Sequence, residues 1–127
     1  MVTDPIADFL VRVRNAGLAG KEAVVIPASK MTNALATLLE KEGYVAGVSK
    51  KKGSPITVTL AYKNGRPVIS GSKRISKPSR RMYMGVREVR PVKRGYGLLV
   101  LSTPAGVMTG KEAREKRVGG EVLFEIW

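Results

Sequence analysis

Charge divides the chain into three segments, and this division limits how the chain can fold. Residues 50–94 hold fourteen lysines and arginines and a single acid, Glu88. The flanking segments, 1–49 and 95–127, each hold as many acidic as basic side chains, so the middle carries the whole net charge of +13. Like charges at this density repel one another in a compact state. A polyanion, most commonly phosphate, would supply the counter-charge and release condensed counterions on binding.

Composition excludes several classes of protein. With 127 residues, 43% of them hydrophobic, the chain can form one domain or two small lobes with a core. No apolar run approaches the roughly 20 residues that span a bilayer. The first residues lack the features of a signal peptide, so we expect neither membrane insertion nor export. The lack of cysteine excludes disulfides and thiolate metal sites, and it fits a cytoplasmic protein.

The chain also lacks histidine, which excludes serine–histidine and cysteine–histidine nucleophiles. We expect no cofactor. Asp4 and Asp8 have a spacing that would suit a carboxylate-bound Mg²⁺, but a helix cap and a charge near the positive helix end explain them better. Glu121 and Glu125 would share one strand face and are expected to be charge partners, since no third ligand is evident. We therefore expect no metal site and no catalytic residue.

The first helix is marked by Asp4 as the N-cap and Pro5 at the first helical position. Gly17 is the expected end of this helix. Arg12 and Arg14 lie off the apolar stripe and point toward solvent or a ligand. The stripe follows the helical period and consists of Ile6, Phe9, Leu10 and Val13.

The rest of the first half predicts a second helix and a small sheet. Ser29 caps the helix and Gly43 ends it. Its buried face is expected to contain Met31, Leu35, Leu38 and Leu39. Strands are predicted at residues 23–27, of buried type, at 44–49 and at 56–62. Asn64 and Gly65 are a strong hairpin signal. These elements form an N-terminal lobe of two helices on a short sheet, over residues 1–72.

The second half predicts a C-terminal lobe, residues 73–127, that is mostly β with one short helix. Residues 76–79 are the best linker candidate because proline and serine interrupt the pattern there. Thr109 and Glu112 open the helix as a capping box, and the helix extends to about residue 117 before Gly119 and Gly120. Strands are predicted near residues 82–84, 86–89, 98–101 and 121–127, with a tight turn at Gly95 and Gly97. The fold class is therefore α+β.

The cationic middle is the first candidate binding site. A solvated surface is the simplest alternative, but a protein that needs charge only for solubility usually intersperses both signs. A membrane surface is less favoured, because the basic residues lie on strands and turns and not on an amphipathic helix. Phosphate contacts are expected from Lys50, Lys51, Lys52, Arg80 and Arg81. Tyr83 follows directly and could stack on an unpaired base, or it could be a core tyrosine with an exposed hydroxyl.

The second candidate is the uncharged segment STPAGVMT at residues 102–109, between an apolar strand and a capped helix. Its small residues let a backbone approach a nucleic acid closely. Its hydroxyls can bond phosphates or ribose 2′-hydroxyls, and the N–H groups at the following helix start favour an anion. An ordinary strand-to-helix turn is the alternative.

This segment resembles the signature of the bacterial small ribosomal subunit protein S8 family, in the residues Ser102, Thr103, Gly106, Val107, Met108 and Thr109. Further blocks resemble the family in the same order along essentially the whole chain. They are DPIAD at 4–8 with RVRN at 12–15, PASK at 27–30, EGY at 42–44, the basic block from Arg74 to Tyr83, and GGE at 119–121.

The resemblance implies two α+β lobes and direct binding, early in assembly, to a stem with an irregular internal loop in the central domain of small-subunit ribosomal RNA. It implies RNA contacts at Ser102, Thr103, Gly106, Thr109, Tyr83, Ser29 and Lys30. By analogy, a similar stem in the protein's own operon messenger RNA would be bound to repress translation. Pro104 and Ala105 depart from the usual polar residues of the signature, and Ser79 replaces the usual glycine.

We therefore expect a non-enzymatic, structural RNA-binding protein of the small ribosomal subunit. Arg12, Arg14, Lys30 and the cationic middle supply phosphate affinity, while the C-terminal segment and Tyr83 read RNA shape. Expected partners are ribosomal RNA, neighbouring small-subunit proteins with protein five among them, and the operon messenger RNA, without a membrane or homo-oligomer. The competing hypotheses are a metal-dependent nuclease built on Asp4 and Asp8, and a DNA-compacting protein.

Overall fold

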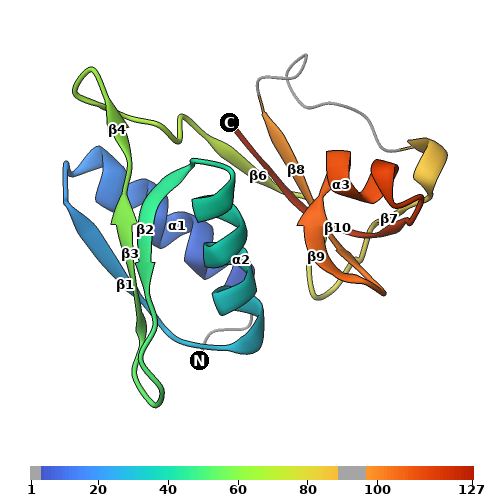
Figure 1. Ribbon diagram of the computed structural model, residues 1–127, viewed down its shortest axis with the longest axis horizontal. Helices are drawn as coiled ribbons and strands as arrows, with labels where there is room; N and C mark the ends of the chain where they lie inside the picture. Colours follow the sequence, from blue (N-terminus) through green and yellow to red (C-terminus); the bar gives the residue numbers. More distant parts are fainter. Residues whose placement is uncertain (1–3, 89–96) are drawn as a thin grey trace. The chain divides into compact units, whose positions relative to one another are not determined.

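The computed structural model describes residues 4–88 and 97–127 (Figure 1). Contacts between residues divide the chain into two compact units, Met1–Ser70 and Gly71–Trp127. Two helices cover a small sheet in the first unit, and antiparallel strands dominate the second, which confirms the predicted α+β class. The predicted lobe limits, 1–72 and 73–127, stay a prediction.

Helix α1, Pro5–Leu18, begins where the sequence predicts. The Asp4 carboxylate accepts a hydrogen bond from the Ala7 N–H at 3.2 Å, and Pro5 occupies the first turn. The expected apolar stripe is buried in full. The helix ends later than predicted, because Gly20 (φ +71°), and not Gly17, takes the left-handed conformation. Gly17 stays helical and lies against Pro67, whose side chain would be 3.3 Å from a Cβ at this position.

Helix α2, Lys30–Lys41, begins with a reciprocal capping box. The Thr32 N–H donates to Ser29 Oγ at 3.0 Å, and the Ser29 N–H donates to Thr32 Oγ1 at 2.9 Å. Gly43 follows the helix with a φ of +81°, as its predicted end requires. Three of the four residues expected on the buried face are buried, and Met31 is half-buried.

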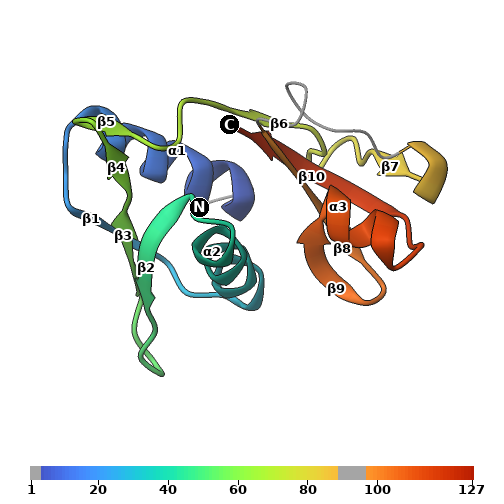
Figure 2. The ribbon, with the colours of Figure 1, turned by 45° about the horizontal axis from the view of Figure 1, so that its top comes forward.

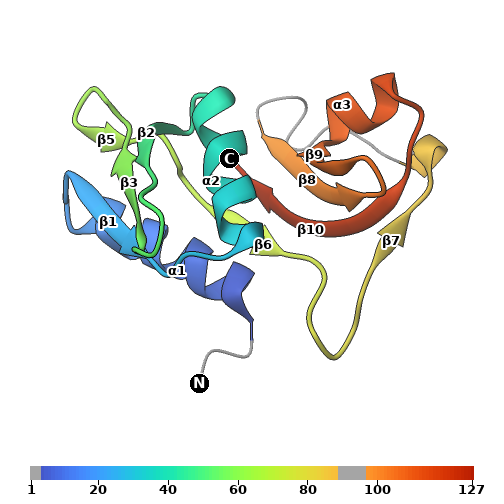
Figure 3. The ribbon, with the colours of Figure 1, turned by 60° about the horizontal axis from the view of Figure 1, so that its bottom comes forward.

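Three antiparallel strands form the sheet of the first unit: β1 (Ala23–Ile26), β2 (Val45–Ser49) and β3 (Ile56–Leu60), in the order β1-β3-β2. Ile56, Val58 and Leu60 alternate with half-buried threonines on β3, and both helices cover their face (Figures 1 and 3). The prediction of a buried first strand is only partly right, because Val25 is 53% exposed.

A small hairpin follows, formed by β4 (Tyr62–Lys63) and β5 (Arg66–Pro67). Asn64 and Gly65 both have positive φ, 53° and 76°, which is the geometry that an Asn-Gly hairpin turn needs. The predicted turn is confirmed, although its strands are only two residues long.

The second unit is built around β10, Gly120–Ile126, which pairs with three other strands. They are β6 (Ser72–Arg74), β7 (Tyr83–Met84) and β8 (Leu98–Thr103), and β8 also pairs with β9 (Gly106–Thr109). The short helix α3, Gly110–Glu115, contacts β8 and β9 (Figure 2). Leu99, Leu101 and Val122 form a buried cluster against which Ile75, Met84 and Trp127 pack.

The sequence predicted neither β6 nor β9 as a strand. The strand predicted at residues 86–89 is wrong where the structure describes it, because Val86–Glu88 form a 3₁₀ turn, η1. Residue 89 and Gly95 of the predicted tight turn lie outside the described residues.

Gly119 and Gly120 allow backbones to approach closely where β10 begins. A Cβ at Gly120 would lie 2.2 Å from the Ser102 carbonyl oxygen, and one at Gly119 would lie 2.4 Å from the Met84 carbonyl oxygen. Helix α3 has already ended at Lys116, so these glycines bring β10 against β7 and β8 and do not serve as the predicted helix stop.

Candidate nucleic-acid interface

Three strands of the second unit place Tyr83, Glu121 and Ser102 in one row. Glu121 on β10 lies directly opposite Tyr83 on β7 and directly opposite Ser102 on β8. Side chains at directly opposed positions project from the same face of a sheet, so the three form neighbouring groups on one surface. Tyr83 is 66% exposed, which excludes the alternative of a core tyrosine. The structure therefore brings two of the predicted contact residues together.

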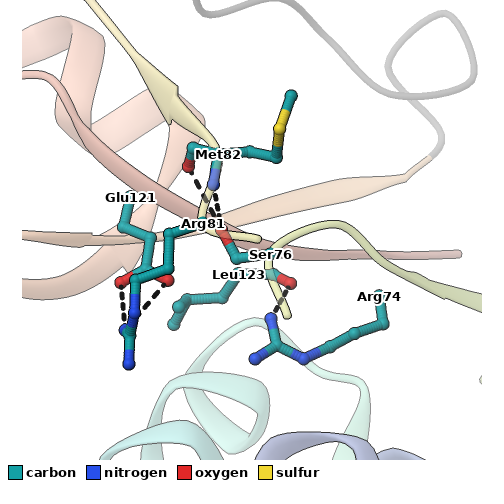
Figure 4. Close-up of polar contacts among 6 residues, drawn as sticks. All are labelled: Arg74, Ser76, Arg81, Met82, Glu121 and Leu123. Atoms are coloured by element: carbon teal, nitrogen blue, oxygen red, sulfur yellow. Dashed lines mark hydrogen bonds and ion pairs between the residues drawn. The ribbon is translucent and has the colours of Figure 1, made fainter. Parts of the chain in front are cut away.

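Glu121 is the residue of this row that the sequence predicted as a charge partner but not as part of a binding surface. Its side chain is only 14% exposed, and Arg81 Nη1 lies 3.2 Å and 3.4 Å from its two carboxylate oxygens (Figure 4). The prediction that Glu121 is a charge partner is confirmed. The prediction that Glu125 shares its face is wrong, because a register shift between Val122 and Phe124 places Glu125 opposite Leu99, on the other face from Ser102.

The basic loop, residues 77–81, replaces the predicted linker. Ser76 at its start is fully buried, and its hydroxyl contacts the Met82 N–H and carbonyl (Figure 4). Lys77 and Arg80 exchange backbone hydrogen bonds of 2.8 Å and 3.0 Å across the tip of the loop. The linker prediction for residues 76–79 is therefore wrong. The loop is a closed, structured element that displays the exposed side chains of Lys77, Arg80 and Arg81.

The signature segment is a β-hairpin, not the loop that the sequence predicted. Strands β8 and β9 pair through Thr103 and Gly106, so Pro104 and Ala105 form a two-residue turn. Thr103 Oγ1 donates to the Gly106 carbonyl at 2.8 Å and accepts from the Ala105 N–H at 3.1 Å. Pro104 occupies the second position of the turn, where proline is favoured. The Thr103 hydroxyl thus shapes the turn, whereas Ser102 belongs to the row.

Thr109 at the end of the hairpin is buried, with 1% exposure. Its Oγ1 accepts from the Glu112 N–H at 3.1 Å, which confirms it as the cap of α3. Thr109 and Gly110 are buried at the start of α3, and an anion contact at this helix start stays a prediction. An RNA contact by the Thr109 hydroxyl stays a prediction, as do the contacts of the other signature residues.

In the first unit, the predicted residues lie on separate elements. Arg12 and Arg14 are exposed on α1, where Arg12 Nε forms an ion pair with Asp8 at 2.8 Å. Asp4 and Asp8 are thus used as a cap and as an ion-pair partner. Lys30 is exposed at the start of α2, and the Ser29 hydroxyl beside it belongs to the capping box.

The remaining predicted cations lie where β2 turns into β3. The Lys50 ammonium donates a hydrogen bond to the Thr37 hydroxyl on α2. Lys51 and Lys52 are exposed in the turn itself, which Gly53 closes with a φ of +80°. Arg90, Lys93 and Arg94, the last cations of the basic segment, lie outside the described residues.

Residues 4–88 and 97–127 contain no group of three or more acidic side chains that could hold a metal ion. None of the helices in these ranges has the length and apolar character needed to cross a bilayer.

Comparison with known proteins identifies relatives along the whole chain. The family model described as "Ribosomal protein S8" matches residues 4–127. The small ribosomal subunit protein uS8 of Nitratidesulfovibrio vulgaris strain DP4 is 54% identical over 127 residues, which cover 100% of both chains. The uS8 protein of Desulfovibrio desulfuricans is 53% identical over the same coverage. That of Roseiflexus castenholzii is 48% identical, covering 99% of this chain and 98% of the relative.

Proposed function

The chain belongs to the ribosomal protein S8 family, and from this premise we propose that it binds a stem with an irregular internal loop in the central domain of small-subunit ribosomal RNA. Membership makes the chain a non-enzymatic, structural constituent of the small ribosomal subunit, associated with ribosomal RNA and other ribosomal proteins. The competing hypothesis of a nuclease is thereby removed. Beyond family membership, the proposal specifies the RNA element that is bound and the surface of the protein that binds it.

One observation carries the proposal: Tyr83, Glu121 and Ser102 form an in-register row beside the basic loop. A tyrosine ring can stack on a base that an internal loop leaves unpaired. A serine hydroxyl can bond a 2′-hydroxyl or a base edge at the neighbouring position. Regular duplex RNA offers neither an unpaired base nor an open deep groove, so this row favours an irregular stem.

The charges around the row support the same conclusion. The Glu121 carboxylate would repel phosphates, but Arg81 lies against both of its oxygens and offsets this charge. Lys77 and Arg80 remain exposed on the loop for phosphate contacts. The phosphates are therefore expected to run along the basic loop, with the bases directed toward the row.

A binding experiment with three RNAs tests this function. The first is the central-domain stem, the second is the same stem with its internal loop replaced by Watson–Crick pairs, and the third is a random duplex of equal length. We expect the first to bind at least about a hundredfold more tightly than the others at about 150 mM salt. Equal binding of all three would reject the proposal. Duplex DNA of equal length is added as a competitor, and its tighter binding would favour the DNA-compacting hypothesis.

Two further partners are part of the proposal, the messenger RNA through the same row and a protein neighbour through family membership. A similar stem in the protein's own operon messenger RNA should compete for the row, and this would repress translation. Small-subunit protein five is the expected protein neighbour. Competition between the two stems, and crosslinking of assembled subunits, test these partners separately.

A further inference from the structure

The Ser76 hydroxyl makes two hydrogen bonds, both to the backbone of Met82. Ser76 is fully buried, and its Oγ accepts from the Met82 N–H at 2.8 Å and donates to the Met82 carbonyl at 3.2 Å (Figure 4). One hydroxyl thus satisfies both backbone groups of a residue six positions away. A buried hydroxyl with donor and acceptor both paired is a well-determined contact, because leaving either group unpaired is costly.

The central strand holds both ends of this contact. The Ser76 N–H donates to the Val122 carbonyl at 3.1 Å, and the Val122 N–H donates to the Met82 carbonyl at 2.8 Å. Ser76, Met82 and Val122 therefore form a closed cluster of hydrogen bonds at the base of the basic loop. We call this cluster the clasp. Both ends of the basic loop, Ser76 and Met82, are therefore hydrogen-bonded to Val122 on β10.

The clasp lies between the groups that would contact RNA. Arg81 directly precedes Met82, and Tyr83 directly follows it. Fixing the Met82 backbone therefore fixes where the Arg81 and Tyr83 side chains begin, and it sets the pairing of Tyr83 with Glu121. Without the clasp, two contacts would tether residues 77–81 to the rest of the described chain: the bond pair at their tip and the Arg81–Glu121 contact.

We propose that Ser76 is a positioning residue for RNA recognition, which holds the basic loop and Tyr83 in the arrangement that the RNA binds. The proposal rests on the proposed function of the row. Its physical basis is preorganisation: a loop that is ordered before binding loses less conformational entropy when the complex forms. Because Ser76 is fully buried, we expect its hydroxyl to act through Met82 and not by touching the RNA.

The test is Ser76→Ala in the full chain, with Ser79→Ala as the matched control. Ser79 is exposed in the same loop, and its hydroxyl makes no hydrogen bond among the described residues. We expect Ser76→Ala to accelerate hydrogen exchange of the Met82 amide about tenfold or more, as the loss of one hydrogen bond predicts. Its affinity for the central-domain stem should fall about tenfold. Ser79→Ala should change each by less than about twofold.

Salt dependence separates positioning from the loss of charge. Ser76→Ala keeps every cation, so the slope of log affinity against log salt should equal that of the wild type while the affinity for the stem falls. Arg80→Gln removes a cation from the same loop and should make the slope shallower by about one. A slope change in Ser76→Ala equal to that of Arg80→Gln would overturn the proposal.

Pro78→Gly is the second variant, and it decides the question if Ser76→Ala does not fold. Pro78 is exposed at the loop tip, and glycine there loosens the loop without touching the buried clasp. Affinity for the stem should again fall, by about threefold, with an unchanged slope. If Pro78→Gly loosens the loop and still binds the stem with wild-type affinity, the proposal is overturned. If the wild type itself shows no preference for the stem, the proposed function fails, whereas unchanged exchange at Met82 in Ser76→Ala rejects the clasp alone.

Discussion

The two units hold similar residues in different arrangements. In the first unit, the predicted cations come from α1, the start of α2 and the turn after β2, and the Ser29 hydroxyl belongs to a helix cap. In the second unit, an aromatic ring, a carboxylate and a hydroxyl stand in one cross-strand row beside a closed cationic loop. The cations of the first unit thus lie on separate helices and a turn, whereas paired strands in the second unit bring separate parts of the sequence into register.

From this difference we propose that the two units contribute different parts of RNA recognition. Phosphate attraction needs positive charge but no particular register, so scattered cations are sufficient for it. Recognition of an unpaired base needs a ring and a hydrogen-bonding group at a fixed spacing, which the row provides. We therefore expect changes in the first unit to weaken binding to all RNAs alike, and changes in the row to remove selectivity.

Tyr83→Ala should have the largest effect. Loss of one stacked base costs about 1–3 kcal/mol, so affinity for the central-domain stem should fall roughly thirtyfold for a loss of about 2 kcal/mol. Binding to random duplex should change little, and titration against both RNAs measures this. Tyr83→Phe keeps the ring and should retain most of the affinity. An equal loss on both RNAs would remove the distinction between the units.

The double variant Lys51→Gln, Lys52→Gln tests the first unit. Both side chains are exposed in the turn after β2, so their removal should leave the fold intact. Each lost phosphate contact should make the salt slope shallower by about one, and by the same amount on both RNAs. A loss confined to the central-domain stem would mean that this turn also reads RNA shape.

Ser102→Ala should have a smaller effect. One hydrogen bond contributes about 1 kcal/mol, so affinity for the stem should fall roughly fivefold. Thr103→Ala should instead loosen the hairpin turn, because the Thr103 hydroxyl bonds Ala105 and Gly106. Thermal unfolding should distinguish the two, with a lower midpoint expected for Thr103→Ala alone. Equal thermal midpoints would count against a structural role for Thr103.

The cap variants should have the smallest effect on binding. Ser29→Ala in the first unit and Thr109→Ala in the second each remove a helix cap, which costs about 1 kcal/mol of unfolding free energy. Neither should change the ratio of stem to random-duplex affinity by more than about twofold. Urea unfolding and titration measure the two quantities. A selective loss in Thr109→Ala would show that this buried hydroxyl is exposed on RNA binding.

The sequence predicted the first unit well because local signals determine it. The caps at Asp4 and Ser29, the apolar periodicity of both helices and the Asn64–Gly65 turn each involve residues close in the chain. The later end of α1 is the exception, because the sequence offers both Gly17 and Gly20 as a stop and only Gly20 takes the left-handed conformation.

The second unit was predicted less well because distant pairing determines it. Strands β6 and β9 are three and four residues long and are defined by their partners β10 and β8. The sequence around Ser76 predicts a linker, because the partner that fixes Ser76 is Val122 on β10, which lies far away in the sequence. The bulge near Leu123 moves Glu125 off the face of Glu121, and no periodicity rule signals it. Residue types predicted the candidate contacts, but only pairing placed Tyr83 and Ser102 on either side of Glu121.

The central claim is that scattered cations supply affinity for any RNA, while the row supplies selectivity for the stem. The most direct test compares salt titrations of the wild type and Tyr83→Ala on the central-domain stem and on random duplex RNA. For about six neutralised phosphates, the account predicts wild-type slopes near −5 on both RNAs, with tighter binding to the stem at every salt concentration. Tyr83→Ala should keep the slope and lose most of this difference. A slope near zero, or a stem preference that persists undiminished in Tyr83→Ala, would contradict the account.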